Sequence, residues 1–144
     1  WVAHCAESNF NLSSGIAPAR SFMEAGIPMG LGTDIGAGTS VSMFRSVKEA
    51  IIASKMYWRL VDSSKQALSF PEAFYLATMG GGSFFGKVGS FLEDYEFDAL
   101  VIDDRKIRQP VPKDPRNRLE RVIYGDDCRV VVDKYIQGRQ IPLS

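Results

Sequence analysis

The residue best suited to chemistry is Asp34, which ends the stretch Gly30-Leu31-Gly32-Thr33-Asp34. This stretch has the form of a short buried strand, and glycines in a strand let other groups approach the backbone closely. A carboxylate at the carboxyl end of a parallel strand is a common metal ligand or acid/base group in α/β proteins. The same carboxylate could instead cap the turn or helix that follows. The pentapeptide alone leaves both interpretations open.

The other polar candidates lie near the start of the chain. His4 is the only histidine, and because a catalytic zinc usually takes three protein ligands, this chain alone is short of ligands. A single histidine among apolar residues is more often a core group than a ligand. Cys5 has no evident base, so a buried thiol is the simpler interpretation. Ser8 and Asn9 could bind substrate, although a role in ordering their loop is simpler.

The elements around these residues alternate in type. The apolar pattern and the turn formers predict a strand at residues 1–6, followed by a polar loop at 7–15. They then predict a helix at 16–25 and a second strand at 27–33. This order is typical of a βαβ unit, whose two strands are parallel and joined by a right-handed crossover. His4 and Asp34 would then face one crevice at the carboxyl ends of the strands.

The rest of the chain changes in character near residue 90, from α/β units to mostly β structure. Before that point we expect a helix from Ser42 to about Tyr57, and another that opens with the capping box Ser69–Glu72 and stops at Gly80–Gly82. After it we expect a strand at residues 97–103 and an extended connection at 104–113, which contains Pro110 and Pro112. We then expect a helix at 114–125 and a hairpin at 129–141.

The composition limits the classes of protein to consider. The 144 residues suffice for one domain, and 17 Lys plus Arg balance 17 Asp plus Glu, so no net field favours nucleic acid or an anionic membrane. No membrane span or signal peptide is evident, and Cys5 and Cys128 lack metal-binding spacing, which favours a reduced, cytoplasmic setting. The chain begins at Trp1, inside a predicted strand, so we expect the C-terminal portion of a longer protein.

Several stretches, in order, resemble the C-terminal part of the amidohydrolase superfamily. They are Val2–Cys5 with Ser8-Asn9 and Leu12–Gly15, Gly30–Asp34, Ala77–Gly81, and Val88–Phe91 with Phe97–Val101. Within the superfamily the resemblance is greatest to the guanine deaminases. The stretches that carry this finer resemblance are Gly38–Ser42, Gly81–Gly86 and Tyr124–Asp127.

The resemblance implies a fold. Members have a (β/α)8 barrel beside a small β-sandwich built from both chain ends. It implies that residues 1–6 are barrel strand seven and residues 28–34 barrel strand eight. Residues 1–90 would be a partial barrel with its C-terminal helices, and residues 91–144 the returning part of the sandwich. A complete barrel needs about 250 residues, so this chain cannot close one.

The resemblance also implies a zinc-dependent activity, the hydrolysis of guanine to xanthine and ammonia by the full-length protein. Asp34 matches the position that binds the zinc and shuttles a proton, whereas the remaining ligands lie outside this chain. His4, Ser8 and Asn9 would be adjacent to the site. One departure is Ala6, where the family usually has proline, and this weakens any transfer of roles to Ser8 and Asn9.

Further expectations follow from the same resemblance. The partner would be a small purine, with no nucleic acid or membrane, and the full-length protein would be a cytoplasmic homodimer. These 144 residues alone would be inactive. Two alternatives remain at this stage: another deaminase or hydrolase of the superfamily, or a non-catalytic α/β binding module.

Overall fold

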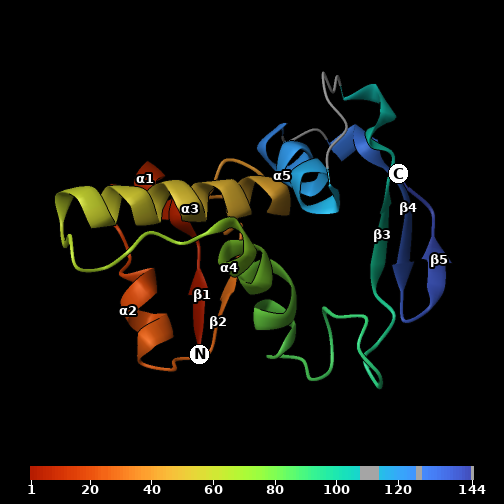
Figure 1. Cartoon of the computed structure of the whole chain (residues 1–144), viewed down its shortest axis with the longest axis horizontal. Helices are drawn as coiled ribbons and strands as arrows, with labels where there is room; N and C mark the ends of the chain where they lie inside the picture. The colour runs from red at the N-terminus through yellow and green to blue at the C-terminus, as the bar shows by residue number, and fades with distance from the viewer. Residues whose placement is uncertain (108–113, 126–127, 144) are drawn as a thin grey trace.

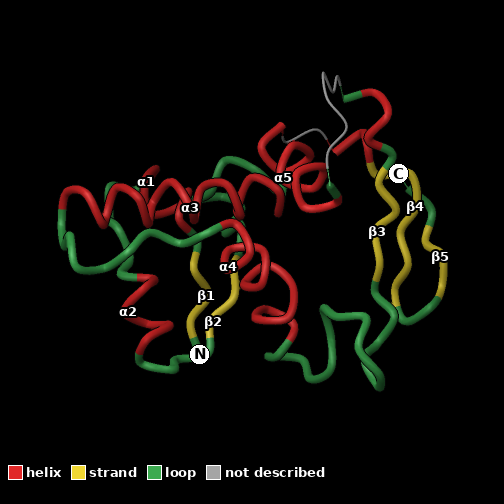
Figure 2. Tube along the Cα trace, viewed as in Figure 1, coloured by secondary structure: helices red, strands yellow, loops and turns green. Residues whose placement is uncertain are grey.

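Two separate sheets and five α-helices make up the described part of the chain, which comprises residues 1–107, 114–125 and 128–143 of a computed structural model. One sheet has two strands and the other has three. Figure 1 shows the two-stranded sheet beneath helix α3, with the three-stranded sheet to one side, beyond helix α5. Figure 2 shows long loops between these parts. Among the described residues, no helix is both long enough and apolar enough to cross a membrane.

The predicted βαβ unit is confirmed at the start of the chain. Its elements are β1 (Val2–His4), α1 (Ala6–Asn11), α2 (Ala19–Glu24) and β2 (Met29–Leu31). The two strands are parallel, with Val2 opposite Met29 and His4 opposite Leu31. Both strands are shorter than predicted. The mixed helix and strand composition confirms the α/β class.

Two local predictions in this unit were wrong. Residues 7–11 are helical in α1, where a polar loop was predicted. This helix is braced by contacts to a loop distant in sequence, which a local pattern cannot reveal. The second helix begins at Ala19, later than predicted, because Pro18 has a ψ of 62°, outside the helical region. Gly26 follows that helix with the expected positive φ, 67°.

Helix α3 (Met43–Leu60) carries much of the core. It begins where predicted, because the Ser42 hydroxyl accepts a hydrogen bond from the Arg45 amide at 3.2 Å. It extends three residues beyond the predicted end at Tyr57. The residues buried on its inner side and the partners packed there form one cluster: Val47, Ile51, Ala73 and Ile123.

Helix α4 (Phe70–Tyr75) opens with the predicted capping box of Ser69 and Glu72. It continues as the π-helix η1 (Leu76–Gly80) and ends at Gly82, where a turn begins, so the predicted stop at Gly80–Gly82 is confirmed. These glycines also allow close packing. A Cβ on Gly30 would lie 2.6 Å from the Gly81 Cα, so the helix and β2 touch backbone to backbone.

The predicted strand and hairpin of the C-terminal part are confirmed. They form an antiparallel sheet of β3 (Ala99–Ile102), β4 (Val131–Ile136) and β5 (Arg139–Ile141). Gln137 and Gly138 both have positive φ, 50° and 76°, as the tight two-residue hairpin turn requires. Single 3₁₀ turns, η2 (Asp104–Lys106) and η3 (Cys128–Val130), flank this sheet.

Helix α5 (Pro115–Gly125) confirms the predicted helix, and the Asp114 carboxylate caps it by accepting a hydrogen bond from the Asn117 amide at 2.9 Å. Ile123 is completely buried in the cluster on α3, so α5 joins the C-terminal part of the chain to the α/β part. The predicted connection through Pro110 and Pro112, and the stretch 126–127, lie outside the described residues.

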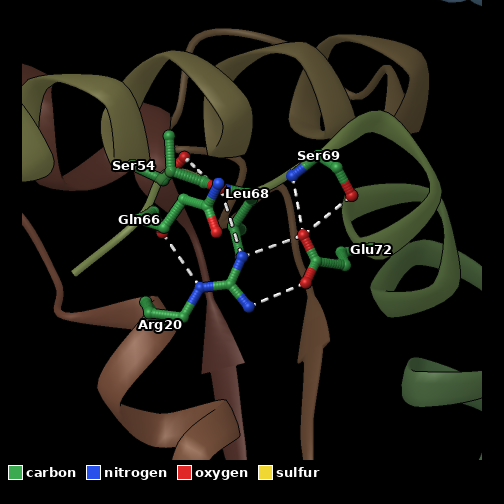
Figure 3. A network of polar contacts seen from close by, with 7 residues as sticks. Arg20, Ser54, Gln66, Leu68, Ser69 and Glu72 are labelled. Carbon is green, nitrogen blue, oxygen red and sulfur yellow. Dashed lines mark hydrogen bonds and ion pairs between the residues drawn. The ribbon is translucent and has the colours of Figure 1, made fainter.

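A network centred on Arg20 ties α2 to the start of α4 (Figure 3). Its guanidinium binds both carboxylate oxygens of Glu72, at 2.7 and 2.9 Å, and also donates to the carbonyls of Gln66 and Ala67. Glu72 in turn accepts hydrogen bonds from the amide and hydroxyl of Ser69. These donors, the guanidinium first, lower the pKa of Glu72 to about 2.

We expect Glu72→Gln to destabilise the protein by about 1–2 kcal/mol at neutral pH, since it removes a charge-assisted pair that is partly screened by solvent. The folded-state pKa of Glu72 is depressed from 4.5 to about 2. Its contribution is therefore present above pH 4.5 and is lost as the pH falls toward 2. Chemical denaturation at a series of pH values gives the free energy of unfolding. Between pH 4.5 and 2 this free energy should fall less steeply in Glu72→Gln than in the unchanged protein.

The matched control is Glu120→Gln, which removes the exposed Arg116–Glu120 pair on α5. It should leave both the stability and its pH dependence unchanged. Equal effects of the two variants would show that the Arg20 network does not contribute as proposed.

Candidate active site

Asp34 sits in a tight turn beyond β2. Its φ is 48°, in the left-handed region that aspartate tolerates better than most residues. Its carbonyl accepts hydrogen bonds from the amides of Ala37 and Gly38, at 3.1 and 2.6 Å. A Cβ on Gly38 would lie 2.0 Å from the Thr33 carbonyl oxygen, so only glycine fits there. The turn therefore fixes the direction in which the Asp34 side chain leaves the backbone.

Ser8 is the one predicted neighbour that the structure joins directly to Asp34. Its hydroxyl donates a hydrogen bond of 2.6 Å to Oδ2 of Asp34. Ser8 is only 4% exposed. The other oxygen of Asp34, Oδ1, accepts no hydrogen bond from any described residue, so it is free to bind another group.

His4 ends β1 and is 3% exposed. Its carbonyl accepts a hydrogen bond from the Gly32 amide at 3.1 Å. Its Nε2 is buried and finds no hydrogen-bond partner among the described residues. Burial lowers the pKa of the imidazole, so the ring is neutral at physiological pH. His4 thus lies near the same end of the sheet as Asp34 but makes no hydrogen bond to it within the described structure.

Asn9 lies in α1, one residue after Ser8. Its amide donates to the Cys5 carbonyl and its carbonyl accepts from the Ser14 amide. The Asn9 side chain makes no hydrogen bond to another residue of the described ranges. The structure therefore gives Asn9 a backbone role in the local fold and does not bring its side chain onto Asp34.

Cys5 packs against the strand that leads to Asp34. A Cβ on Gly32 would lie 2.9 Å from the Cys5 sulfur. Burial raises the pKa of the Cys5 thiol, the negative charge of Asp34 raises it further, and the Gly32 amide partly offsets both. Because thiolates and not thiols are the nucleophiles, these effects disfavour Cys5 as a nucleophile. The prediction of a buried thiol was wrong in its burial, since Cys5 is only half-buried.

Contacts that the sequence analysis missed brace α1 against the loop after Asp34. The Asn11 side chain donates to the Ala37 carbonyl at 2.7 Å. The Glu7 carboxylate accepts a hydrogen bond from Thr39 and pairs with Arg45 at 2.7 Å. No local sequence signal pointed to the hydrogen bonds of Asn11 and Glu7, because their partners are 26 and 32 residues away in the chain. Together they close the loop 35–42 onto the helix that carries Ser8.

The metal-binding capacity of the site is limited to one carboxylate. No cluster of three or more His, Cys, Asp or Glu side chains occurs within the described ranges. Asp34 fits as a single zinc ligand, because it is a carboxylate with one oxygen not engaged in the described structure. A complete zinc site would need ligands in addition to those that these residues supply.

Comparison with known proteins identifies the class to which this arrangement belongs. The profile of the amidohydrolase family matches residues 1–141. The chain therefore belongs to the amidohydrolase family. The superfamily predicted from the sequence stretches is confirmed.

Within that family, several similar relatives are guanine deaminases. The chain is 33% identical over 147 residues to guanine deaminase from Dictyostelium discoideum, covering 97% of this chain and 32% of that protein. A crystal structure of guanine deaminase from C. acetobutylicum with bound guanine matches with a TM-score of 0.91 and 48% identity, over 96% of this chain and 33% of that one. This chain therefore spans about a third of the length of these relatives.

A second kind of relative also matches. The crystal structure of an adenosine deaminase from Xanthomonas campestris with bound zinc has a TM-score of 0.79 and 28% identity, and covers 96% of this chain and 31% of that one. The relatives from Dictyostelium discoideum and C. acetobutylicum confirm the predicted resemblance to guanine deaminases. The Xanthomonas campestris structure shows that a similar fold also occurs in an adenosine deaminase.

We expect Gly38→Ala to destabilise the protein by about 1–3 kcal/mol, because its methyl group would overlap the Thr33 carbonyl oxygen in the turn that holds Asp34. Gly125→Ala is the control, since a Cβ there meets no atom of the described residues within 4 Å. Its effect should stay within about 0.5 kcal/mol. Chemical denaturation of both variants checks this, and equal stabilities would contradict the tight turn.

Proposed function

We propose that these residues form the C-terminal portion of a zinc-dependent guanine deaminase, which hydrolyses guanine to xanthine and ammonia. The observation that carries the proposal is the match to the C. acetobutylicum enzyme with bound guanine, at 48% identity and over 96% of this chain. The chain supplies one candidate zinc ligand, so we propose that it is inactive without the rest of the protein.

We propose that β1 and β2 are strands seven and eight of a (β/α)8 barrel. Their parallel register and the helices between them support this assignment. Residues 1–90 would be the partial barrel with its C-terminal helices, and residues 91–144 the returning part of a β-sandwich. The separate antiparallel sheet of β3, β4 and β5 supports that division, with α5 as the contact between the two parts.

In this proposal Asp34 is both a zinc ligand and the group that moves the proton. Bound zinc would supply a water acidic enough to ionise near neutral pH. Asp34 would accept a proton from the water that attacks the ring carbon bearing the amino group. As the bond from that carbon to nitrogen breaks, Asp34 would return the proton to the departing amino group, which leaves as ammonia. His4, Ser8 and Asn9 lie beside this site in the proposal, and only Ser8 contacts Asp34 directly.

The remaining proposals concern partners and location. The substrate is a small purine, and the balanced charge of the chain gives no reason to expect nucleic acid or membrane as a partner. A homodimeric full-length protein in the cytoplasm is proposed on the family resemblance. A second candidate function is adenosine deamination, which the Xanthomonas campestris relative supports at 28% identity. The family membership favours hydrolase chemistry over a non-catalytic binding module.

We expect Asp34→Asn in the full-length protein to reduce turnover strongly and weaken zinc binding, since it removes the proton acceptor and a negatively charged ligand. The loss of turnover should be about 10²–10⁴-fold, the range of a general acid–base contribution. Steady-state ammonia release and metal analysis after dialysis measure the two effects.

Asp94→Asn is the matched control. Asp94 also has a positive φ, 66°, but it lies on an exposed segment and pairs with Lys87. It should keep full turnover and zinc content. Activity retained in Asp34→Asn would show that Asp34 is not the catalytic carboxylate.

We also expect the full-length protein to prefer guanine over adenosine by about 100-fold or more in kcat/KM, because a site that hydrogen-bonds one purine edge leaves polar groups unpaired with another. Ammonia release from equal concentrations of guanine, adenine and adenosine measures this preference. A preference for adenosine would favour the second candidate.

A further inference from the structure

We propose that Ser8 is a positioning residue, which fixes the orientation of the Asp34 carboxylate by occupying Oδ2 and so leaves Oδ1 to face the metal. This inference rests on the proposed function, in which Asp34 is the zinc ligand. It concerns a contact that joins α1 to the turn after β2, two elements that follow parallel neighbouring strands.

The geometry of the contact is that of a strong hydrogen bond. The donor–acceptor distance is 2.6 Å, within the range of a hydroxyl that donates to an ionised carboxylate. Ser8 is 4% exposed whereas Asp34 is exposed, so the hydrogen bond runs from a buried donor to a carboxylate at the surface. A hydroxyl donates only one proton, and here that proton is committed to one of the two carboxylate oxygens.

Both ends of this hydrogen bond are held in place. Asp34 cannot easily turn, because its φ of 48° belongs to a turn closed by the Ala37 and Gly38 amides. Helix α1 cannot easily move away, because Asn11 binds the Ala37 carbonyl on one side of Ser8 and Glu7 pairs with Arg45 on the other. The hydroxyl therefore meets a carboxylate whose position is already restricted, which is how outer hydrogen bonds orient metal ligands.

The two carboxylate oxygens of Asp34 have different surroundings. Oδ2 is taken by Ser8, whereas Oδ1 accepts no hydrogen bond within the described part of the chain. Without the Ser8 hydroxyl, the carboxylate could rotate about its χ2 torsion, a broad and soft coordinate. Zinc would then have to select one of several orientations, and its affinity would fall.

The test uses the full-length protein with zinc and three variants. Ser8→Ala should weaken zinc binding about 10–100-fold, as loss of an outer-shell partner does, and lower kcat without a matching rise in KM. Ser8→Thr keeps the hydroxyl and should restore most of the zinc affinity. Ser14→Ala, an exposed serine beyond the end of α1, should behave as the unchanged protein. A chelator competition titration gives the zinc affinity independently of turnover, and thermal unfolding confirms that each variant is folded.

A double-mutant cycle keeps the test decisive even where Ser8→Thr does not fold. In the Asp34→Asn background, adding Ser8→Ala should change the zinc affinity little, because the group that Ser8 orients is already altered. The proposal is overturned by unchanged zinc affinity in folded Ser8→Ala, or by effects of Ser8→Ala and Asp34→Asn that simply add.

These results separate this inference from the proposed function. If Asp34→Asn keeps its turnover, the assignment of Asp34 itself is wrong. If Asp34→Asn loses zinc and turnover while Ser8→Ala keeps both, only the role of Ser8 fails.

Discussion

The parallel pairing of β1 and β2 is the constraint from which the rest of the site follows. Because His4 lies opposite Leu31, the residues that leave both strands at their carboxyl ends emerge at one edge of the sheet. The first of these segments becomes α1 and carries Ser8, and the second becomes the turn that carries Asp34. A shift of the register by one residue would turn every side chain of the strand to the other face. The Ser8–Asp34 contact therefore depends on backbone hydrogen bonds several residues away.

Close packing of glycines secures this small sheet from the other side. A Cβ on Gly80 would lie 2.7 Å from the Met29 carbonyl oxygen, and one on Gly30 would lie 2.6 Å from the Gly81 Cα. The helical segment after α4 thus lies directly on the backbone of β2. The Arg20 network holds the start of α4 at the same time, so α2, α4 and β2 are tied into one unit. Asp34 lies three residues after β2, so its backbone is attached directly to that unit.

The sequence predicted this structure best where the signals are local. The capping box at Ser69, the helix opened by Asp114 and the Gln137-Gly138 turn were all found, because each depends on a few neighbouring residues. The packing role of Gly80 was not found, since a Cβ there would meet the carbonyl oxygen of Met29, in a strand about 50 residues away in the chain. Helix α1 was missed for a similar reason: contacts to the loop 35–42 brace it, and six residues alone are too short to form a stable helix.

Asp34 illustrates the limit of such predictions at a site. Its position after a glycine-rich strand was visible in the sequence, whereas Ser8 was considered for substrate binding, for ordering its loop and as a neighbour of the site, and not as a partner of Asp34. The hydrogen bond between them depends on the strand register and on α1, neither of which a local pattern fixes. Among the described residues, the buried Nε2 of His4 has no hydrogen-bond partner, although buried polar atoms are normally hydrogen-bonded. The parallel sheet of β1 and β2 has only two strands, although parallel sheets are normally covered on both faces. Both observations support the proposal that the catalytic site is completed by residues beyond this chain.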